Sequence, residues 1–307
     1  MPVKKRDFLS ISDLSVEEIH ALFARTEELK KSRFLDAFKN KAVGLIFQKP
    51  SLRTRVSFQV GVWQLGGQCM SLSPAEVNIG VRESIKDAAR TLSRYLDLIV
   101  ARVFKHREVE ELGQYSLVPV INGLSDSYHP CQALADIFTV KEKRGSVNGL
   151  TLVYLGDGNN VCNSLLQITS MLGMNMKVAC PKGYAPNKEV LEFAQAQGKK
   201  TGATIMVTQD PKDAVRGADV LYTDVWASMG QEREAAKRAK IFKKYQINKE
   251  LMGLAKNNAL VMHCLPAHRG AEITDDCLDS PNSVVFDEAE NRLHVQKAIM
   301  LKLAEGR

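Results

Sequence analysis

The stretch Val43–Arg55, with the sequence VGLIFQKPSLRTR, decides the fold, because an apolar segment runs directly into a cluster of hydroxyls and guanidiniums. Val43–Phe47 predicts a buried strand, and Val56–Trp63 predicts the helix that follows it. The first N–H groups of a helix lack intrahelical partners and lie at the positive end of its dipole. Ser51 and Thr54, with the arginines beside them, therefore predict a phosphate pocket that needs no metal. The turn is not a Walker loop, and its alternative interpretation is a capped helix with solvated arginines.

The size and charge of the chain limit the classes of function that fit it. Its 307 residues suffice for two α/β domains of ordinary size. Forty-two basic and thirty-five acidic residues give a net charge of +7, but the charge is scattered and no basic stripe alternates with aromatic residues. Small anionic substrates are therefore a better explanation of the charge than nucleic acid.

The cysteines and the N-terminal segment predict a cytoplasmic protein. The six cysteines contain no C-x-x-C pair, and a chain of this size does not need disulfides to fold, so reduced thiols are expected. Met1–Leu9 lacks the apolar core of a secretory signal, and no apolar stretch reaches the length that a bilayer requires.

Further polar residues follow strands in the first half of the chain. Leu98–Ala101 predicts a strand that ends on Arg102, and Leu117–Asn122 predicts the next strand. His129 and Gln132 come at the start of the following helix, where they are suited to polarise a carbonyl and to hold an amide-like NH2 group. Ligands bind at the carboxyl ends of strands in open α/β sheets, so these residues are expected at the edge that carries Ser51. The alternatives are a surface arginine and a capping or core histidine.

A second α/β unit is predicted from Gly149 onward, and its strands alternate with helices as in a parallel, doubly wound sheet. The turn Gly156–Asn160 resembles a dinucleotide-binding turn, but it lacks the third glycine, so NAD is only weakly indicated. The charged stretch Gln231–Lys244 predicts a solvated helix. Val284–Asp287 predicts the last strand, and Ala289–Leu303 predicts the last helix.

Two strand ends in the second unit carry candidate chemistry. Asp224 follows Val220–Thr223 and is suited to bind an ammonium group, and Ser228–Gly230 after it is a candidate closing loop. His263, Cys264 and His268 follow another strand, but their spacing matches no standard zinc framework. A half-buried Cys264 in contact with substrate is the better interpretation.

Taken in order, these segments resemble the ornithine carbamoyltransferase family over nearly the whole chain. The carriers of the resemblance are Ser51–Arg55, Ala101–Val103, His129–Asp136, Asp157–Val161, Asp224–Gly230, His263–Pro266 and Glu290–Arg292. The first three look like the carbamoyl-phosphate site of transcarbamoylases in general. The D-G-N-N turn, the S-M-G loop and H-C-L-P are specific to the ornithine branch.

The resemblance implies a role for each matching residue. Ser51, Arg53 and Thr54 would bind phosphate, with Leu52 contributing its backbone N–H. Arg102 would bridge phosphate and carbonyl oxygen, and His129 would polarise that carbonyl. The residues expected around the carbamoyl end are Gln132, Cys264, Leu265 and Arg292, and those expected to hold ornithine are Asn160, Asp224, Ser228 and Met229.

The resemblance also implies an architecture. Residues 1–144, with a C-terminal helix 288–307 that returns to them, would bind carbamoyl phosphate, and residues 145–287 would bind ornithine. The family is typically a homotrimer. Two positions depart from its pattern: Leu52 stands where Thr is usual, and Asn78 stands where the family commonly has a Gln that reaches into a neighbour's site. The anion site is expected to survive the first change.

The implied reaction is attack by the δ-amine of L-ornithine on the carbonyl carbon of carbamoyl phosphate, which gives citrulline and phosphate. Cys264 and Asp224 are candidates to help remove the amine's proton, and no metal or organic cofactor is required. Acetylornithine, putrescine and aspartate are alternative acceptors, and Asp224 favours ornithine because an acetylated amine has no use for that carboxylate. From other classes, an NAD-binding dehydrogenase and a nucleic-acid binder remain as alternatives.

Overall fold

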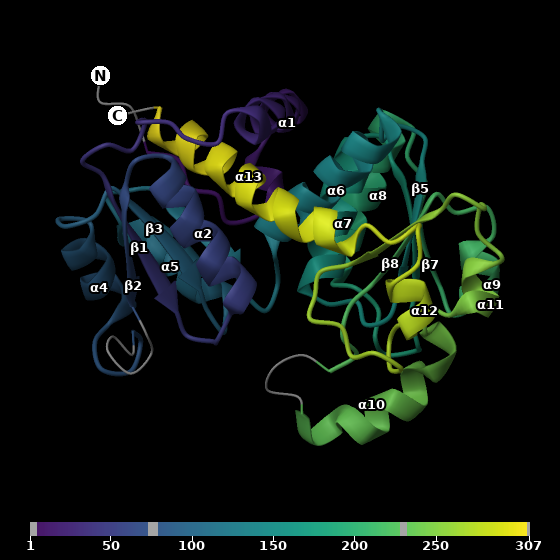
Figure 1. Cartoon of the computed structure of the whole chain (residues 1–307). Coiled ribbons are helices and arrows are strands. Elements are labelled where there is room, and N and C mark those ends of the chain that lie inside the picture. Colours follow the sequence, from purple (N-terminus) through teal and green to yellow (C-terminus); the bar gives the residue numbers. More distant parts are fainter. Residues whose placement is uncertain (1–4, 73–78, 228–231, 306–307) are drawn as a thin grey trace. The chain divides into compact units, whose positions relative to one another are not determined.

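The computed structural model describes residues 5–72, 79–227 and 232–305. The chain forms two compact units, Met1–Ala135 with Glu290–Arg307 and Asp136–Ala289. Each unit is built on its own parallel sheet (Figure 1). Asn78, Ser228 and Met229 lie outside the described residues.

The sheet of the first unit has four parallel strands in the order β2-β1-β3-β4. Its strands are β1 (Ala42–Phe47), β2 (Gln68–Leu72), β3 (Leu98–Arg102) and β4 (Val120–Leu124). Its helical segments are η1 (Ile11–Asp13), α1 (Val16–Lys31), α2 (Leu52–Gln64), α4 (Ile85–Leu92) and α5 (His106–Tyr115). Two longer helices, α6 (Pro130–Arg144) and α13 (Val285–Ala304), each contain a boundary between the units.

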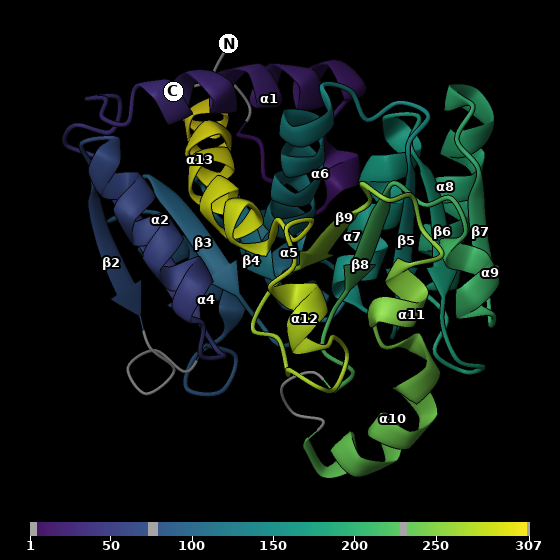
Figure 2. The same ribbon diagram turned by 45° about the vertical axis from the view of Figure 1, so that its right-hand side comes forward.

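Alternating side chains on the first sheet pack against helices. Ile99 and Ala101 of β3 share a core with Ile85 of α4 and with Val109 and Leu112 of α5. Helix α2 packs against α13 at Gly61, where an added Cβ would lie 3.3 Å from the side chains of α13. The two helices are seen together in the turned view (Figure 2). This packing brings the C-terminal part of α13 against the helix that begins at the Ser51–Arg55 turn.

The sheet of the second unit has five parallel strands in the order β7-β6-β5-β8-β9. Its strands are β5 (Thr151–Leu155), β6 (Asn175–Ala179), β7 (Ile205–Thr208), β8 (Val220–Thr223) and β9 (Leu260–His263). Its helical segments are α7 (Asn160–Met171), α8 (Lys188–Thr201), α9 (Pro211–Val215), η2 (Glu232–Glu234), α10 (Ala235–Phe242), η3 (Lys243–Tyr245), α11 (Lys249–Met252) and α12 (Asp275–Leu278).

The two faces of the second sheet have different neighbours. Val153, Leu221 and Val261 point into a core that also contains residues of α9, α10, α11 and α12. The alternate residues Tyr154 and Tyr222 are fully buried and stack with ring centroids 5.8 Å apart. A strand that is buried on both faces is expected in a parallel sheet covered by helices on each side.

The fold class predicted from the sequence is confirmed, with two parallel-sheet α/β units and residues from Glu290 onward belonging to the first. The predicted strand Val284–Asp287 is wrong, because α13 already begins at Val285 and only one bridge, Val261 to Ser283, forms nearby. A short apolar run does not by itself separate a strand from a buried helix start. The strand predicted at Leu117–Asn122 is displaced, since β4 runs from Val120 to Leu124.

The stretch Gln231–Lys244, predicted as a solvated helix, is helical over its described residues as η2, α10 and η3, and most of its side chains are exposed. Arg238 and Phe242 are the exceptions, since both are buried. Among the helices of the described segments, none is long and apolar enough to cross a membrane.

Candidate functional site

The first group of candidate residues lies at the carboxyl edge of the first sheet. Strands β1, β3 and β4 are parallel neighbours, so the segments that leave their ends emerge side by side. The Ser51–Arg55 turn follows β1, Arg102 ends β3, and His129 follows β4. The sheet therefore brings together residues that are as much as 78 positions apart in the sequence, from Ser51 to His129.

The turn after β1 is the start of a helix. Ser51 is the N-cap of α2 with extended backbone (φ −160°, ψ 111°), and the helix begins at Leu52. Thr54 is buried, and its Oγ1 accepts a 2.7 Å hydrogen bond from Nη2 of Arg292 on α13. Leu52 exposes its side chain, so only its backbone N–H can serve the turn.

Two buried guanidiniums give this edge its positive charge. Arg102 and Arg292 are both nearly inaccessible to solvent. His129 is buried near both of them, and its pKa is lowered well below the ordinary 6.5, first by burial and then by the charges of Arg292 and Arg102. The imidazole is therefore neutral at physiological pH, and a neutral imidazole can donate a hydrogen bond to a carbonyl without adding charge.

Gln132 is buried on the first turn of α6, three residues after His129, while Ser51 and Arg53 are half-buried at the start of α2. Cys264 and Leu265, which were also predicted around the carbamoyl end, belong to the second unit. The edge as a whole offers a helix N-terminus, a hydroxyl, guanidiniums and a neutral imidazole. Groups of these kinds are suited to bind an anion next to a polarised carbonyl.

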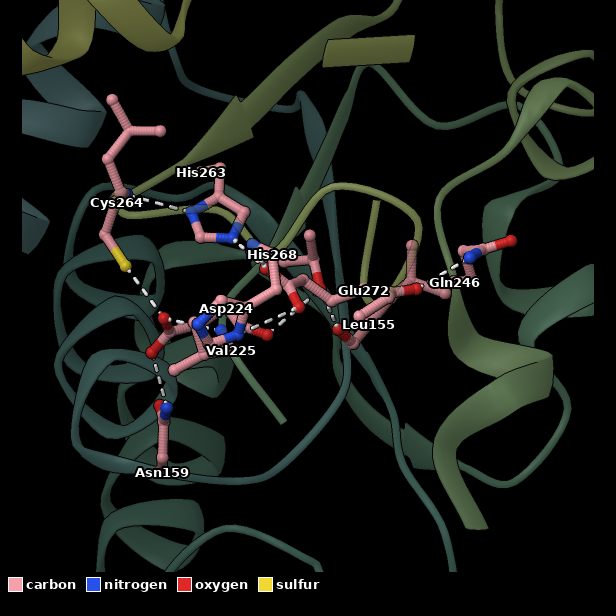
Figure 3. Close-up of polar contacts among 12 residues, drawn as sticks. Leu155, Asn159, Asp224, Val225, Gln246, His263, Cys264, His268 and Glu272 are labelled. Carbon is pink, nitrogen blue, oxygen red and sulfur yellow. Dashed lines mark hydrogen bonds and ion pairs between the residues drawn. The ribbon is translucent and has the colours of Figure 1, made fainter. Parts of the chain in front are cut away.

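The second group of candidate residues lies at the carboxyl edge of the second sheet (Figure 3). Strands β5, β8 and β9 are parallel neighbours, and the segments after them carry Asn159, Asp224 and Cys264. Asn159 Nδ2 donates a 2.6 Å hydrogen bond to Oδ2 of Asp224, and Cys264 Sγ donates to Oδ1 at 3.0 Å. The backbone N–H of Val225 also donates to Oδ1, at 2.7 Å. Asp224 is thus a carboxylate fixed by three donors.

Cys264 is a thiol rather than a thiolate. Burial raises its pKa well above the ordinary value of 9.0, and the charge of Asp224 and the hydrogen bond to it raise the pKa further. A thiol that donates to a carboxylate leaves the carboxylate as the basic member of the pair.

His263 supports the turn that follows β9. Its Nδ1 accepts a 2.8 Å hydrogen bond from the N–H of Leu265, and its Nε2 lies 3.1 Å from Oε1 of the buried Glu272. Leu265 adopts φ +54°, a conformation that leucine rarely takes and that concentrates at functional sites. The side chains of Asp224, His263 and Cys264 bring possible ligand atoms within 4.8 Å of one another. Both ring nitrogens of His263 already have hydrogen-bond partners, Nδ1 in Leu265 and Nε2 in Glu272, and His268 is exposed.

Sequence reasoning missed the residues that hold this edge together. Asn160 was singled out, but it is Asn159 that bonds Asp224 and also caps α7, with its Oδ1 accepting from Val161 and Cys162. An Asn directly before a helical pattern is an N-cap signal that could have identified it. Arg238 was also missed, although it donates to Asp157 at 2.6 Å and to the Trp226 carbonyl at 2.8 Å. No local pattern marks such a distant partner.

The first sheet edge thus gathers buried guanidiniums, and the second fixes a carboxylate with three hydrogen-bond donors, within two parallel-sheet α/β units. Two family profiles match the chain: "Aspartate/ornithine carbamoyltransferase, carbamoyl-P binding domain" over residues 6–142, and "Aspartate/ornithine carbamoyltransferase, Asp/Orn binding domain" over residues 148–303. The chain belongs to the aspartate/ornithine carbamoyltransferase family.

Individual relatives agree with the family match. The chain is 51% identical to an ornithine carbamoyltransferase of Thermococcus kodakarensis, over 98% of this chain and 97% of the relative. It is 49% identical to a Pyrococcus furiosus protein named "Ornithine carbamoyltransferase, anabolic", over 98% of this chain and 97% of that relative. A solved structure of ornithine carbamoyltransferase from Pyrococcus furiosus superposes with a TM-score of 0.94 at 49% identity, covering 98% of this chain and 97% of that one.

Proposed function

We propose that the chain transfers the carbamoyl group of carbamoyl phosphate to the δ-amine of L-ornithine, giving L-citrulline and phosphate. The observation that carries this proposal is the division of charge between the two sheet edges. The first edge presents the buried guanidiniums of Arg102 and Arg292, and the second presents the fixed carboxylate of Asp224. One suits a phosphate dianion and the other suits the ammonium of an amino acid.

At the first edge, the N-terminus of α2 binds the phosphate, with Ser51, Arg53 and Thr54 as side-chain donors and Leu52 as a backbone donor. Negative charge grows on the carbonyl oxygen as the amine attacks. Arg102 and the neutral His129 stabilise that charge as hydrogen-bond donors, and Gln132 and Arg292 hold the carbamoyl end. Losing one donor of this kind typically costs about 2.7–4 kcal/mol of transition-state stabilisation.

At the second edge, Asp224 and Asn160 bind the α-amino end of ornithine, with Ser228 and Met229 completing the amino-acid site. The δ-amine attacks only when neutral, and the ordinary pKa of such an amine is about 10.4. Because the raised pKa of Cys264 keeps it a thiol, Asp224 is the better acceptor for the first proton. The Cys264 and Leu265 carbonyls contact the carbamoyl NH2 group.

The transfer balances without a metal or redox cofactor. A C–N bond forms between the δ-nitrogen and the carbonyl carbon, and the bond from that carbon to the phosphate oxygen breaks. The second proton of the attacking nitrogen leaves with the phosphate, which departs into the site that already binds it. Positioning and electrostatic stabilisation supply the rate enhancement.

Phosphate release and formation of the carbamoylated product from carbamoyl phosphate test this proposal, with L-ornithine, N-acetylornithine, putrescine and L-aspartate offered in parallel. We expect turnover with ornithine alone. Turnover with another amine would keep the phosphate site and refute the role given to Asp224. No turnover with any of them would refute the proposal as a whole. The anabolic Pyrococcus furiosus relative supports the citrulline-forming direction.

We further propose that the chain assembles as a homotrimer through α2, in a cytoplasmic setting. Leu52, Val56 and Trp63 follow one face of α2 at helical spacing and expose 72%, 47% and 63% of their area. An apolar stripe of this kind on a helix that carries the phosphate turn fits contact with a second copy. Light scattering should give three times the chain mass, and Trp63→Glu should reduce it. A monomeric wild-type protein would refute the assembly.

A further inference from the structure

Two buried carboxyl groups lie beneath the carboxylate edge of the second unit. Asp136 on α6 and Glu288 on α13 are both completely inaccessible to solvent. Asp136 is the first residue of this unit after the chain leaves the other, and Glu288 is the next to last before the chain returns. Neither side chain has a place in the transfer chemistry proposed above.

The two groups are joined to each other and to the two strands that carry the site. Tyr222 of β8 lies with its hydroxyl 3.0 Å from Oδ2 of Asp136 and 3.3 Å from Oε1 of Glu288. The N–H of His263, the last residue of β9, donates a 3.1 Å hydrogen bond to Oε2 of Glu288. The Glu288 and Asp136 side chains are also hydrogen-bonded to each other.

A hydrogen bond between two carboxyl groups requires a proton on one of them. Two charged carboxylates in contact repel each other, and a fully buried site offers no water to screen that repulsion. The contacts show which oxygen of Glu288 is suited to carry the proton, since Oε2 accepts the His263 N–H and Oε1 is the oxygen that lies 3.3 Å from the Tyr222 hydroxyl. The shorter Tyr222 contact goes to Asp136. Burial and the neighbouring charge of Asp136 raise the pKa of Glu288 well above the ordinary 4.5.

We propose that Asp136 and Glu288 share one proton, carried by Glu288, and act together as a positioning pair that fixes the ends of β8 and β9. Tyr222 stands two residues before Asp224, and His263 stands directly before Cys264. The pair thus holds the two segments whose side chains meet at the 3.0 Å Cys264–Asp224 contact. Its kinetic consequence rests on the proposed function, but its protonation state does not.

Other titratable groups surround the pair and enter any measurement against pH. Tyr222 faces it from β8, and its own pKa is raised well above 10.0 by burial and by the two carboxyl groups. His263 and Cys264 lie on the β9 side, and Asp224 follows β8. On the two helices, Lys143 and Asp287 form an ion pair at 3.0 Å, and Arg292 follows one turn further along α13.

Infrared difference spectroscopy at neutral pH tests the shared proton directly. Subtracting the spectrum of Glu288→Gln from that of the wild-type protein should leave a carbonyl band of a protonated carboxylic acid, which shifts in D2O. A difference that contains only carboxylate bands would overturn the proposal. This result does not depend on what the protein catalyses.

Stability against pH provides a second measurement on the same variant. A group whose folded pKa is raised stabilises the fold below its unfolded pKa and loses that contribution as the pH rises. Gln mimics the protonated acid. The difference in Tm, Glu288→Gln minus wild type, should therefore increase as the pH rises from about 4.5. A difference that is constant with pH would overturn the proposal.

The two isosteric variants should also differ in activity. Glu288→Gln preserves one donor and one acceptor, so kcat/KM for ornithine should stay within about threefold of the wild type. Asp136→Asn places an amide where the Tyr222 hydroxyl and the proton of Glu288 donate. The ends of β8 and β9 should then be displaced, which should lower kcat/KM for ornithine by roughly 10²-fold. The KM for carbamoyl phosphate should not change in either variant. Equal loss in both variants, in an enzyme that is active as wild type, would overturn the positioning role alone.

Discussion

The two sheet edges are built by the same rule and stabilised by different means. Both collect polar residues at the carboxyl ends of three neighbouring parallel strands. The first edge relies on charge, with buried Arg102 and Arg292 beside a neutral His129. The second relies on hydrogen-bond geometry, with three donors converging on Asp224.

Because of this difference, substitutions at the two edges should have different kinetic effects. Removing a guanidinium from the first edge weakens the attraction for the anion, and no neighbouring group replaces that attraction. Removing a donor or the carboxylate from the second edge changes where an amino acid is held. Variants at the first edge should therefore lower kcat and raise the KM for carbamoyl phosphate. Variants at the second edge should raise the KM for ornithine.

The largest effect is expected at the first edge, for Arg102→Ala. Arg102 is buried at the end of β3, where its charge cannot be supplied by solvent. Loss of one such donor from a developing oxyanion should reduce kcat by about 10²–10³-fold. Steady-state kinetics with varied carbamoyl phosphate at saturating ornithine measures the effect.

Arg94→Ala is the matched control, because Arg94 is an exposed arginine of the same unit. It should leave both kinetic constants unchanged. If Arg102→Ala remained folded and kept a kcat close to that of the wild type, the charge-based account of the first edge would be wrong.

The next effect belongs to the second edge, for Asp224→Asn. The amide keeps the shape of the side chain but loses the charge and one acceptor oxygen. The KM for ornithine should rise by roughly 10²-fold, since an ammonium loses its carboxylate partner, while the KM for carbamoyl phosphate stays constant. The value of kcat should also fall, because Asp224 is the proposed acceptor of the first proton. Asp210→Asn, an exposed N-cap position of α9 where Asn also caps well, serves as the control. A parallel rise in both KM values would contradict the separation of the two edges.

A smaller effect concerns the neutrality of His129. Its lowered folded pKa means that below pH 6.5 the unfolded chain takes up a proton that the folded chain does not. The free energy of unfolding should therefore fall as the pH drops below 6.5, by up to about 1.4 kcal/mol per pH unit. His129→Gln should lose less stability than the wild type between pH 7 and pH 5, as measured by denaturant unfolding.

His294→Gln separates this stability effect from catalysis. Burial and the charge of Lys297 lower the pKa of His294 to about 4. This variant should therefore also lose less free energy of unfolding than the wild type as the pH falls. It lies on α13 away from the strand ends and should keep its kcat, whereas His129→Gln should not. Equal kinetics in the two variants would remove His129 from the carbonyl-polarising role.

The sequence predicted the strand ends well because their signals are local. An apolar run followed by polar residues marks a strand that leaves a sheet, as at Val43–Phe47 and Leu98–Ala101. Parallel topology then brings Thr54, Arg102 and His129 to one edge without further information. The roles given to these residues stay predictions.

What the sequence did not reveal depends on partners that are distant in the chain. Asp136 and Glu288 are 152 positions apart and meet only because α6 and α13 both pack near Tyr222. The helix start at Val285 was mistaken for a strand because Val284, Val285 and Phe286 form a short apolar run. Tertiary contacts decide both cases, and a local pattern cannot report them.

The smallest effect should come from Leu52→Thr, which sharpens the account of the first edge. Leu52 is the first residue of α2, and its side chain is exposed, so it serves the phosphate through its backbone alone. A threonine hydroxyl adds one donor to a site that already has Thr54, guanidiniums and a helix N-terminus. The KM for carbamoyl phosphate should fall by about twofold to fivefold, the equivalent of one neutral hydrogen bond. Val56→Thr, one turn along the same exposed stripe, is the control and should leave that KM unchanged. A tenfold or larger gain would mean that the anion site depends on a side-chain hydroxyl that this chain lacks.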